Sequence, residues 1–246
     1  TTLFDLAGSA DMTFMGGLTP SLPWMTFDGV NDYVTAANVP TDMQFQFSDS
    51  FTVGMWCIIN WEGDYPSYRT LISTQPSAPD YSGIEIGTDS SPNRRKLIFM
   101  LRRDNSPSIY TWVVLDNDLP INTPIYLIWT YDGTRTSGSM NVYVNGVSES
   151  VTYTSVGTTS SIPYGSQNFS LGARDNSVLF HSSIGAVHIY NKELTSSEAL
   201  RNYNATKSNY LFIVTSGLVF NLDANESASY PGSGSTWYDT AGSNDG

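Results

Sequence analysis

The 246-residue sequence contains one cysteine and two histidines. Cys57 cannot form an intrachain disulfide, and its apolar setting, residues 53–59, predicts a buried, inert thiol instead of a nucleophile. His181 and His188 are too few for a zinc site, and the strand-like pattern around His188 indicates ordinary packing. We therefore expect apolar burial, without disulfides, to hold the fold together.

Positive charge is also scarce: 11 Lys and Arg oppose 23 Asp and Glu, for a net charge of −12. Such a balance repels phosphate backbones, so nucleic acid is not an expected partner. One basic cluster brackets the apolar run 97–101, and we interpret it as charge that protects a strand edge, in preference to an anion site. Its members are Arg94, Arg95, Lys96, Arg102 and Arg103.

Long apolar runs are absent as well. No stretch approaches the roughly 18 residues that cross a bilayer, and no signal-peptide pattern is recognisable. We expect no membrane insertion. Because the first residue is Thr1 and not Met, we expect a processed product or an excised fragment.

Aromatic residues make up 13% of the chain, and the many Ser, Thr, Asn and Gly residues favour short strands joined by polar turns. Residues 51–59 are apolar on both faces, which predicts a central strand covered on each side. Four shorter or edge strands are expected over 69–73, 83–87, 96–101 and 109–115. Further strands are expected over 125–131, 140–144, 147–153, 168–172 and 183–190.

Three local patterns predict turns and a helix. Residues 24–27 and 33–35 flank a turn rich in Gly, Asp and Asn, which predicts a hairpin. Asn145-Gly146 is the strongest hairpin signal, because both central residues of a type I′ turn need positive φ. Thr195 and Glu198 form a capping box that begins a helix running to about residue 203.

The two ends of the sequence share a pattern of an aromatic residue, Asp, any residue, Ala-Gly-Ser, any residue and Asp, at 4–11 and 238–245. Two explanations fit this echo. The chain is one period of a tandem array, or its last segment supplies a strand that completes a domain in itself or in a neighbour. A chance match of a low-complexity stretch is the third reading.

Four segments, in this order, resemble the laminin-G-like, concanavalin A-like jelly-roll family: residues 27–34, 50–56, 143–146 and 187–195. The resemblance implies an all-β, antiparallel jelly-roll β-sandwich with one short C-terminal helix. Members of this family are common in secreted carbohydrate-binding proteins and in the virion proteins of tailed bacteriophages.

Residues 217–224 and 229–237 resemble the lead-in that precedes such domains in phage structural proteins, although here they follow the domain. We therefore predict a laminin-G-like sandwich over 1–213, and a segment over 214–246 that completes it or begins a following repeat. A strand supplied in this way could pair with an open sheet edge and link subunits. The predicted linkage residues are Leu218, Val219, Phe220 and Leu222.

Catalytic residues are not expected. Glycosidases on this fold use a Glu-x-Asp-x-x-Glu strand, and the sequence has no such segment. Glu85 and Asp89 come nearest, and we interpret them as exposed acidic residues on one side of a strand.

Asp28, Asn31 and Asp32 offer oxygen ligands in a tight turn, which suits calcium, and relatives often hold calcium near such loops. The alternative is a simple Asx-turn, since the twelfth position of an EF-hand loop would fall on Val39. Calcium is the one cofactor that the sequence suggests.

Aromatic residues in the stretch after the first long strand form a candidate glycan patch, since sugar rings stack on exposed aromatics. The alternative is that they cap the sandwich core. The predicted glycan patch consists of Trp61, Tyr65, Tyr68 and Tyr81.

Together these observations predict a non-catalytic structural or surface component of a virion or filament. The alternative is a calcium-assisted carbohydrate-binding adhesin module. Expected partners are other copies of the chain, other virion or filament proteins, and surface glycans. The expected location is a virion surface or the extracellular space.

Overall fold

The computed structural model describes the backbone of residues 2–3 and residues 11–60, 69–76, 81–88, 96–103, 108–158, 161–165, 167–175 and 177–210. The chain divides into a compact unit over Thr1–Tyr210 and a second unit over Leu211–Gly246, and all of the described residues lie in the first unit. The predicted linkage residues 218–222 lie outside the described residues, so the predicted boundary at 213 stays a prediction. In the described part of the chain, no helix is long and apolar enough to span a bilayer.

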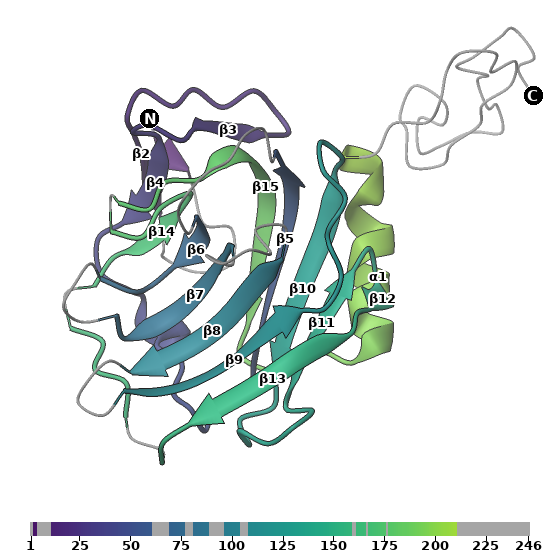
Figure 1. Cartoon of the computed structure of the whole chain (residues 1–246). Coiled ribbons are helices and arrows are strands. Elements are labelled where there is room, and N and C mark those ends of the chain that lie inside the picture. The colour runs from purple at the N-terminus through teal and green to yellow at the C-terminus, as the bar shows by residue number, and fades with distance from the viewer. Residues whose placement is uncertain are drawn as a thin grey trace, which may run out of the picture. The chain divides into compact units, whose positions relative to one another are not determined.

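Two antiparallel sheets make up the described fold (Figure 1). The nine-stranded sheet has the order β1-β2-β4-β14-β6-β7-β8-β9-β13, and the six-stranded sheet has the order β12-β11-β10-β5-β15-β3. This arrangement confirms the predicted all-β sandwich.

The strands of the nine-stranded sheet are β1 (Thr2–Leu3), β2 (Met12–Met15), β4 (Tyr33–Ala36), β14 (Phe169–Leu171), β6 (Thr70–Ser73), β7 (Gly83–Thr88), β8 (Leu97–Arg103), β9 (Ile109–Leu115) and β13 (Val151–Val156). Those of the six-stranded sheet are β12 (Val147–Ser148), β11 (Met140–Val144), β10 (Ile125–Tyr131), β5 (Phe51–Ile59), β15 (His181–Tyr190) and β3 (Met25–Asp28). The helices are α1 (Ser196–Thr206) and the 3₁₀ turns η1 (Thr41–Met43) and η2 (Lys207–Asn209).

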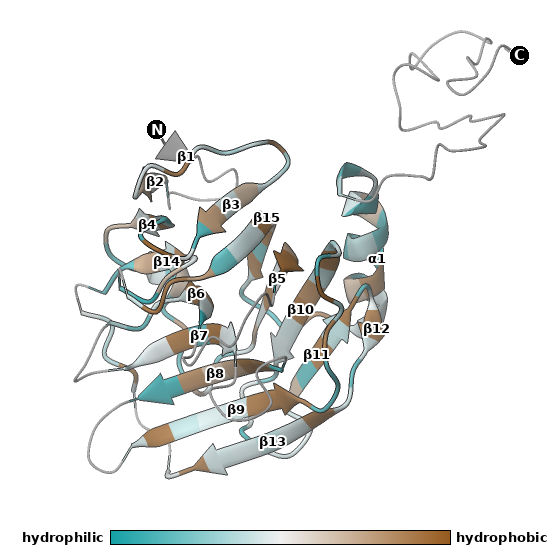
Figure 2. Cartoon of the chain, turned by 45° about the horizontal axis from the view of Figure 1, so that its top comes forward, coloured by the Kyte–Doolittle hydropathy of each residue, from teal (hydrophilic) through white to brown (hydrophobic). Residues whose placement is uncertain are grey.

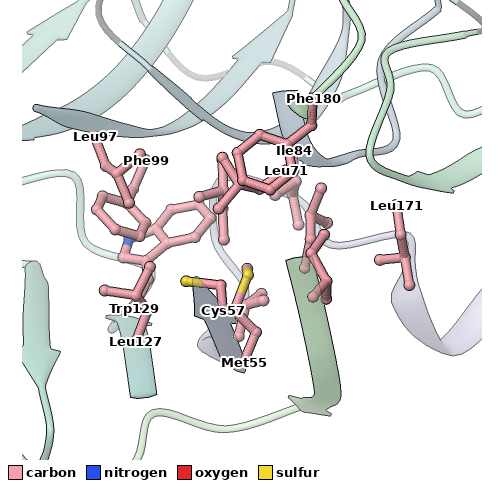
Figure 3. Close-up of a cluster of buried hydrophobic side chains, with 14 of the residues drawn as sticks. Met55, Cys57, Leu71, Ile84, Leu97, Phe99, Leu127, Trp129, Leu171 and Phe180 are labelled. Carbon is pink, nitrogen blue, oxygen red and sulfur yellow. The ribbon is translucent and has the colours of Figure 1, made fainter. Parts of the chain in front are cut away.

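The hydrophobic core lies between the two sheets, where side chains from both inner faces meet (Figure 3). Trp129 packs edge-on against Phe51 at 5.0 Å and beside Phe99 at 6.0 Å, which joins β10, β5 and β8. Strand β5 lies between β10 and β15 and is buried on both faces, as its sequence predicted. Cys57 lies within it as a buried free thiol whose pKa is raised by burial, which confirms the predicted inert setting.

One predicted hairpin is confirmed and one is wrong. Asn145 and Gly146 have φ of 53° and 79° and join β11 to β12, with Val144 paired to Val147. By contrast, β3 pairs with β15 in the six-stranded sheet, whereas β4 pairs with β2 and β14 in the nine-stranded sheet. The turn at 29–32 therefore carries the chain from one sheet to the other, a change that local turn chemistry does not encode.

The interpretation of 69–73, 83–87, 96–101 and 109–115 as shorter or edge strands is corrected in one respect. All four exist, as β6 to β9, but each has a neighbour on both sides within the nine-stranded sheet. The basic residues around β8 therefore do not protect an edge. Arg102 and Arg103 are half-buried within the sheet, and Arg94 and Arg95 lie outside the described residues.

Helix α1 covers the outward face of the six-stranded sheet through aromatic and polar contacts. The predicted capping box is present, with Thr195 as N-cap and Glu198 bonding back to it. Trp56 is fully buried beneath the helix, stacks on Tyr126 at 5.3 Å and on Tyr210 at 4.7 Å, and donates from Nε1 to Thr206 Oγ1 at 2.8 Å. These contacts fix the helix to the sheet and explain why it extends past the predicted end at 203.

His188 lies on β15 under this helix, and the Tyr126 hydroxyl shares a hydrogen bond of 3.1 Å with its Nδ1 atom. Burial lowers the pKa of His188 below its ordinary value of 6.5. The unfolded chain therefore binds the proton more readily than the folded chain, and stability should fall as the pH drops from about 6.5 through the lowered pKa. His188→Gln should flatten this part of the urea-denaturation stability profile. An unchanged slope in His188→Gln would contradict this assignment.

Candidate functional site

The candidate site lies on the outward face of the nine-stranded sheet, over β9 and its neighbours. Burial alternates along β9: Ile109, Thr111, Val113 and Leu115 are buried toward the core. The intervening residues, Tyr110, Trp112 and Val114, are half-buried and point outward. The outward face of β9 thus presents two large aromatic rings to solvent.

Tyr110 and Trp112 form one contiguous surface, because their ring centroids are 4.9 Å apart with an interplanar angle of 36°. On the edge strand β13, Thr154 lies opposite Trp112 and Val156 lies opposite Tyr110. Figure 2 shows β13 in pale shades between brown ends, which matches its Thr and Ser residues. We call the surface made by Tyr110, Trp112, Thr152 and Thr154 the aromatic platform.

Polar groups mark both ends of the aromatic platform. Asp116 accepts hydrogen bonds from Ser150 and, at 2.7 Å, from Thr152 Oγ1, and these bonds lower its pKa. At the opposite end, Arg135 donates from Nη2 to the carbonyls of Val156 (2.8 Å) and Tyr110 (3.2 Å). The ends of β9 and β13 are therefore held in register by side-chain hydrogen bonds.

On the side of the aromatic platform toward β8 and β7, the outward face of the sheet is buried. Trp112 pairs with Met100 on the neighbouring strand β8, and Met100 pairs in turn with Glu85 on β7. Met100 is 5% exposed and Glu85 is 0% exposed. Access to this face therefore lies over β9 and β13, at the sheet edge.

The prediction that Glu85 is an exposed acidic residue is wrong, because its side chain is fully buried. Its Oε1 accepts from Thr70 Oγ1 at 2.6 Å, and its Oε2 forms an ion pair with Arg174 Nη1 at 3.2 Å. Burial raises the pKa of this carboxyl group, and the Arg174 guanidinium opposes that rise. Alternation alone could not show that the outward face is covered at this point. Asp89 lies outside the described residues.

The geometry around Glu85 is that of a structural ion pair. Glycosidic hydrolysis needs a second carboxyl group across the bond. In the described ranges, Glu85 has Thr70 and Arg174 as its polar partners, and no group of three or more His, Cys, Asp or Glu residues is placed to hold a metal ion.

The Asp28 turn has the geometry of an Asx-turn. Asp28 Oδ1 accepts from the backbone N–H groups of Val30 (2.8 Å), Asn31 (3.2 Å) and Asp32 (3.3 Å), and these bonds lower the pKa of Asp28. Asp32 Oδ2 accepts in turn from the Asp28 N–H at 3.2 Å. Backbone donors thus account for one oxygen of each carboxylate, and calcium at these residues stays a prediction.

One of the four residues of the predicted glycan patch lies in the described part of the chain, and glycan binding at the patch stays a prediction. Trp61, Tyr65 and Tyr68 lie outside the described residues. Tyr81 is half-buried, with the guanidinium carbon of Arg174 at 4.7 Å from its ring centroid and that of Arg102 at 5.2 Å. The aromatic platform was missed by sequence reasoning, although the alternation of residues 109–115 could have indicated it.

Comparison with known families gives one match that covers well over half of the chain. The family is described as the concanavalin A-like lectin/glucanases superfamily, and the match spans residues 28–199. The chain belongs to this family. The resemblance of its four segments is therefore confirmed, and the sandwich is lectin-like. A search of curated proteins gives no match.

Solved structures with a similar fold include receptor-binding domains of botulinum neurotoxins. The serotype G binding domain aligns with a TM-score of 0.64 and 16% identity over 89% of this chain and 51% of its own. The serotype D binding domain aligns with a TM-score of 0.61 and 13% identity over 81% and 47%. A structure of botulinum neurotoxin type C, whose cell entry depends on interaction with two ganglioside molecules, aligns with a TM-score of 0.58 and 19% identity over 81% of this chain and 47% of its own. The chain spans about half the length of these structures, and at this identity the likeness concerns the fold.

Proposed function

We propose that this chain is a non-catalytic, glycan-binding module displayed on a surface outside the cell, with the aromatic platform as its binding site. The observation that carries the proposal is the pair of outward-facing rings of Tyr110 and Trp112 on β9. Aromatic faces stack on the apolar C–H face of a sugar ring, and nearby Thr hydroxyls and Asp116 can bond to sugar hydroxyls. The lectin-like fold and the receptor-binding neighbours support this choice.

The chemistry of the aromatic platform favours a neutral or weakly basic glycan over an anionic one. Asp116 is ionised at neutral pH, since the ordinary pKa of an Asp carboxyl group is already far below 7 and the hydrogen bonds from Ser150 and Thr152 lower the pKa of Asp116 further. The whole chain carries a net charge of −12, which disfavours densely sulfated or phosphorylated ligands.

Replacing Trp112 with alanine should weaken glycan binding about tenfold or more, as loss of an aromatic anchor does at other interfaces. Binding would be measured on a glycan array, with and without calcium, followed by titration of any ligand found. Tyr33→Ala is the matched control, because Tyr33 lies on β4 of the same sheet, separated from β9 by β14, β6, β7 and β8. Equal losses in both variants, or silence of the wild-type chain on a broad array, would contradict the proposal.

The calcium arm of this experiment tests Asp28, Asn31 and Asp32. Calcium-dependent binding that is lost in Asp32→Asn would support an ion at that turn. Calcium-independent binding would leave the Asx-turn as the complete account of these residues.

A second candidate is a purely structural component of a virion or filament. It is favoured by the shared pattern at 4–11 and 238–245 and by the phage-like lead-in at 217–224. In that role the sandwich decorates or links subunits, and its partners are other copies of the chain or neighbouring virion proteins.

A further inference from the structure

Strand β15 has an edge that no other described strand covers along part of its length. Over His181–Ile184 it lies between β5 and β3, but over Val187–Tyr190 its pairing within the described residues is with β5 alone. The residues just before β3 do not extend its pairing with β15. Instead, Ser21 and Trp24 form an isolated bridge with each other. We call the edge of β15 at residues 187–190 the open slot.

Among the described residues, no strand pairs with the backbone groups on the outer edge of the open slot. In an antiparallel pair, alternate residues direct their N–H and C=O groups away from the partner strand. About half of the backbone groups of the open slot therefore point away from β5. At its start, the Ala186 N–H donates to the Tyr210 hydroxyl at 2.7 Å, so a side chain occupies the place of a strand there.

Apolar side chains in the open slot are also incompletely covered. Val187 and Ile189 pack against the core yet remain half-buried, whereas Val53 and Met55, which face them on β5, are buried. On the opposite face, His188 contacts Tyr126. Residues 187–190 contain neither proline nor ionised side chains, the usual means by which proteins protect an exposed strand edge.

We propose that the open slot receives residues 218–222 of a second copy of this chain as an added β-strand. In an extended strand, Leu218, Phe220 and Leu222 of this segment would lie on one face, and Val219 and Asn221 would lie on the other. The first set would complete the core beside Val187 and Ile189. Five extended residues span about 16 Å, which covers the roughly 13 Å of a four-residue edge.

The order of motifs in the sequence favours a second copy over the chain's own segment. The pattern at 4–11 leads directly into β2, while its echo at 238–245 follows the apolar segment 218–222. The segment therefore stands in front of a second pattern, as the beginning of a following unit. Strand addition of this kind relies on backbone hydrogen bonds for affinity and on alternate side chains for specificity.

Such a contact is head-to-tail, because the donor segment and the open slot are different surfaces of the chain. Heterologous contacts that do not close into a ring build open filaments. The proposal rests on the structural-component candidate above, and names the surface by which copies would join. It is independent of the aromatic platform on the other sheet.

Sedimentation of the full chain over a wide range of concentrations tests the proposal. The wild type should form a series of species that grows with concentration, and Phe220→Asp should remain monomeric because a charge would enter the core. Val219→Asp is the matched control, since this side chain would lie on the opposite face of the added strand, and the variant should still associate. A synthetic peptide of residues 216–224 should disperse the wild-type species.

Hydrogen exchange at residues 187–190 distinguishes between the results that would contradict the proposal. A wild type that is monomeric at every concentration, with these amides exposed, would show that the slot takes no strand. A monomer whose amides are protected in the wild type and exposed in Phe220→Asp would show pairing within one chain, which also overturns the proposal. Loss of association in both aspartate variants would contradict the proposed strand, in which Phe220 and Val219 lie on opposite faces. Glycan binding by a monomer would leave the proposed glycan function intact.

Discussion

Replacing Arg174 with methionine should destabilise the protein by about 3–5 kcal/mol at neutral pH, the usual cost of leaving a buried charge unpaired. Glu85 is fully buried, and Arg174 is the cation within ion-pair distance of it among the described residues. Thr70 would still donate its hydrogen bond, but a neutral hydroxyl compensates poorly for a lost guanidinium. Urea denaturation would measure the loss.

The pH dependence of this loss gives the sharper test. The pKa of Glu85 is raised above its ordinary value of 4.5, so the folded chain binds the proton more readily than the unfolded chain. Stability therefore falls as the pH rises from about 4.5 through the raised pKa, and removing Arg174 should extend this fall to higher pH. The deficit of Arg174→Met should shrink toward acidic pH.

Glu85→Gln combined with Arg174→Met supplies the control, because it removes both charges together. The double variant should recover most of the stability that Arg174→Met loses, and the double-mutant cycle separates the ion pair from the contact of Arg174 with Tyr81. A deficit that is constant with pH, or that persists in the double variant, would show that Arg174 acts through packing alone.

Trp56→Ala should cost about 3–5 kcal/mol, the range for deleting a large buried aromatic side chain. The indole is fully buried, stacks on Tyr126 and Tyr210, and donates to Thr206 at the end of α1. Its loss removes the contacts that hold the helix on the sheet. We expect a lower urea midpoint together with faster amide exchange throughout α1.

Trp112→Ala is the matched control for this experiment, since it deletes the same side chain from the half-buried outward face of β9. Its effect on stability should be much smaller than that of Trp56→Ala. Comparable losses at the two positions would mean that Trp112 is part of the fold and that the aromatic platform is no free surface. This comparison therefore also tests the basis of the proposed glycan site.

The sequence predicted those parts of the fold that depend on local pattern. The apolar run at 51–59, the Asn145-Gly146 turn and the Thr195 capping box are each determined by neighbouring residues, and each is present as expected. The assignment of β3 and β4 to one hairpin failed because strand partners are chosen by long-range packing. The interior position of β6 to β9 could not be predicted for the same reason.

The candidate site was less predictable than the fold. Glu85 alternates with apolar residues as an exposed residue would, and its burial depends on Arg174, which is 89 residues away in sequence. Tyr110 and Trp112 also alternate with core residues, but alternation does not show that the outward face is accessible at these two residues and buried at Met100 on the neighbouring strand. Burial on the outward face depends on chain segments far away in sequence.

Cys57, the one sulfhydryl of the chain, is sealed inside β5 and stays protonated because burial raises its pKa. The folded chain therefore depends on neither an oxidising nor a reducing environment. A chain of this kind can reach its final shape in a reducing cytoplasm and keep it after release into an oxidising medium.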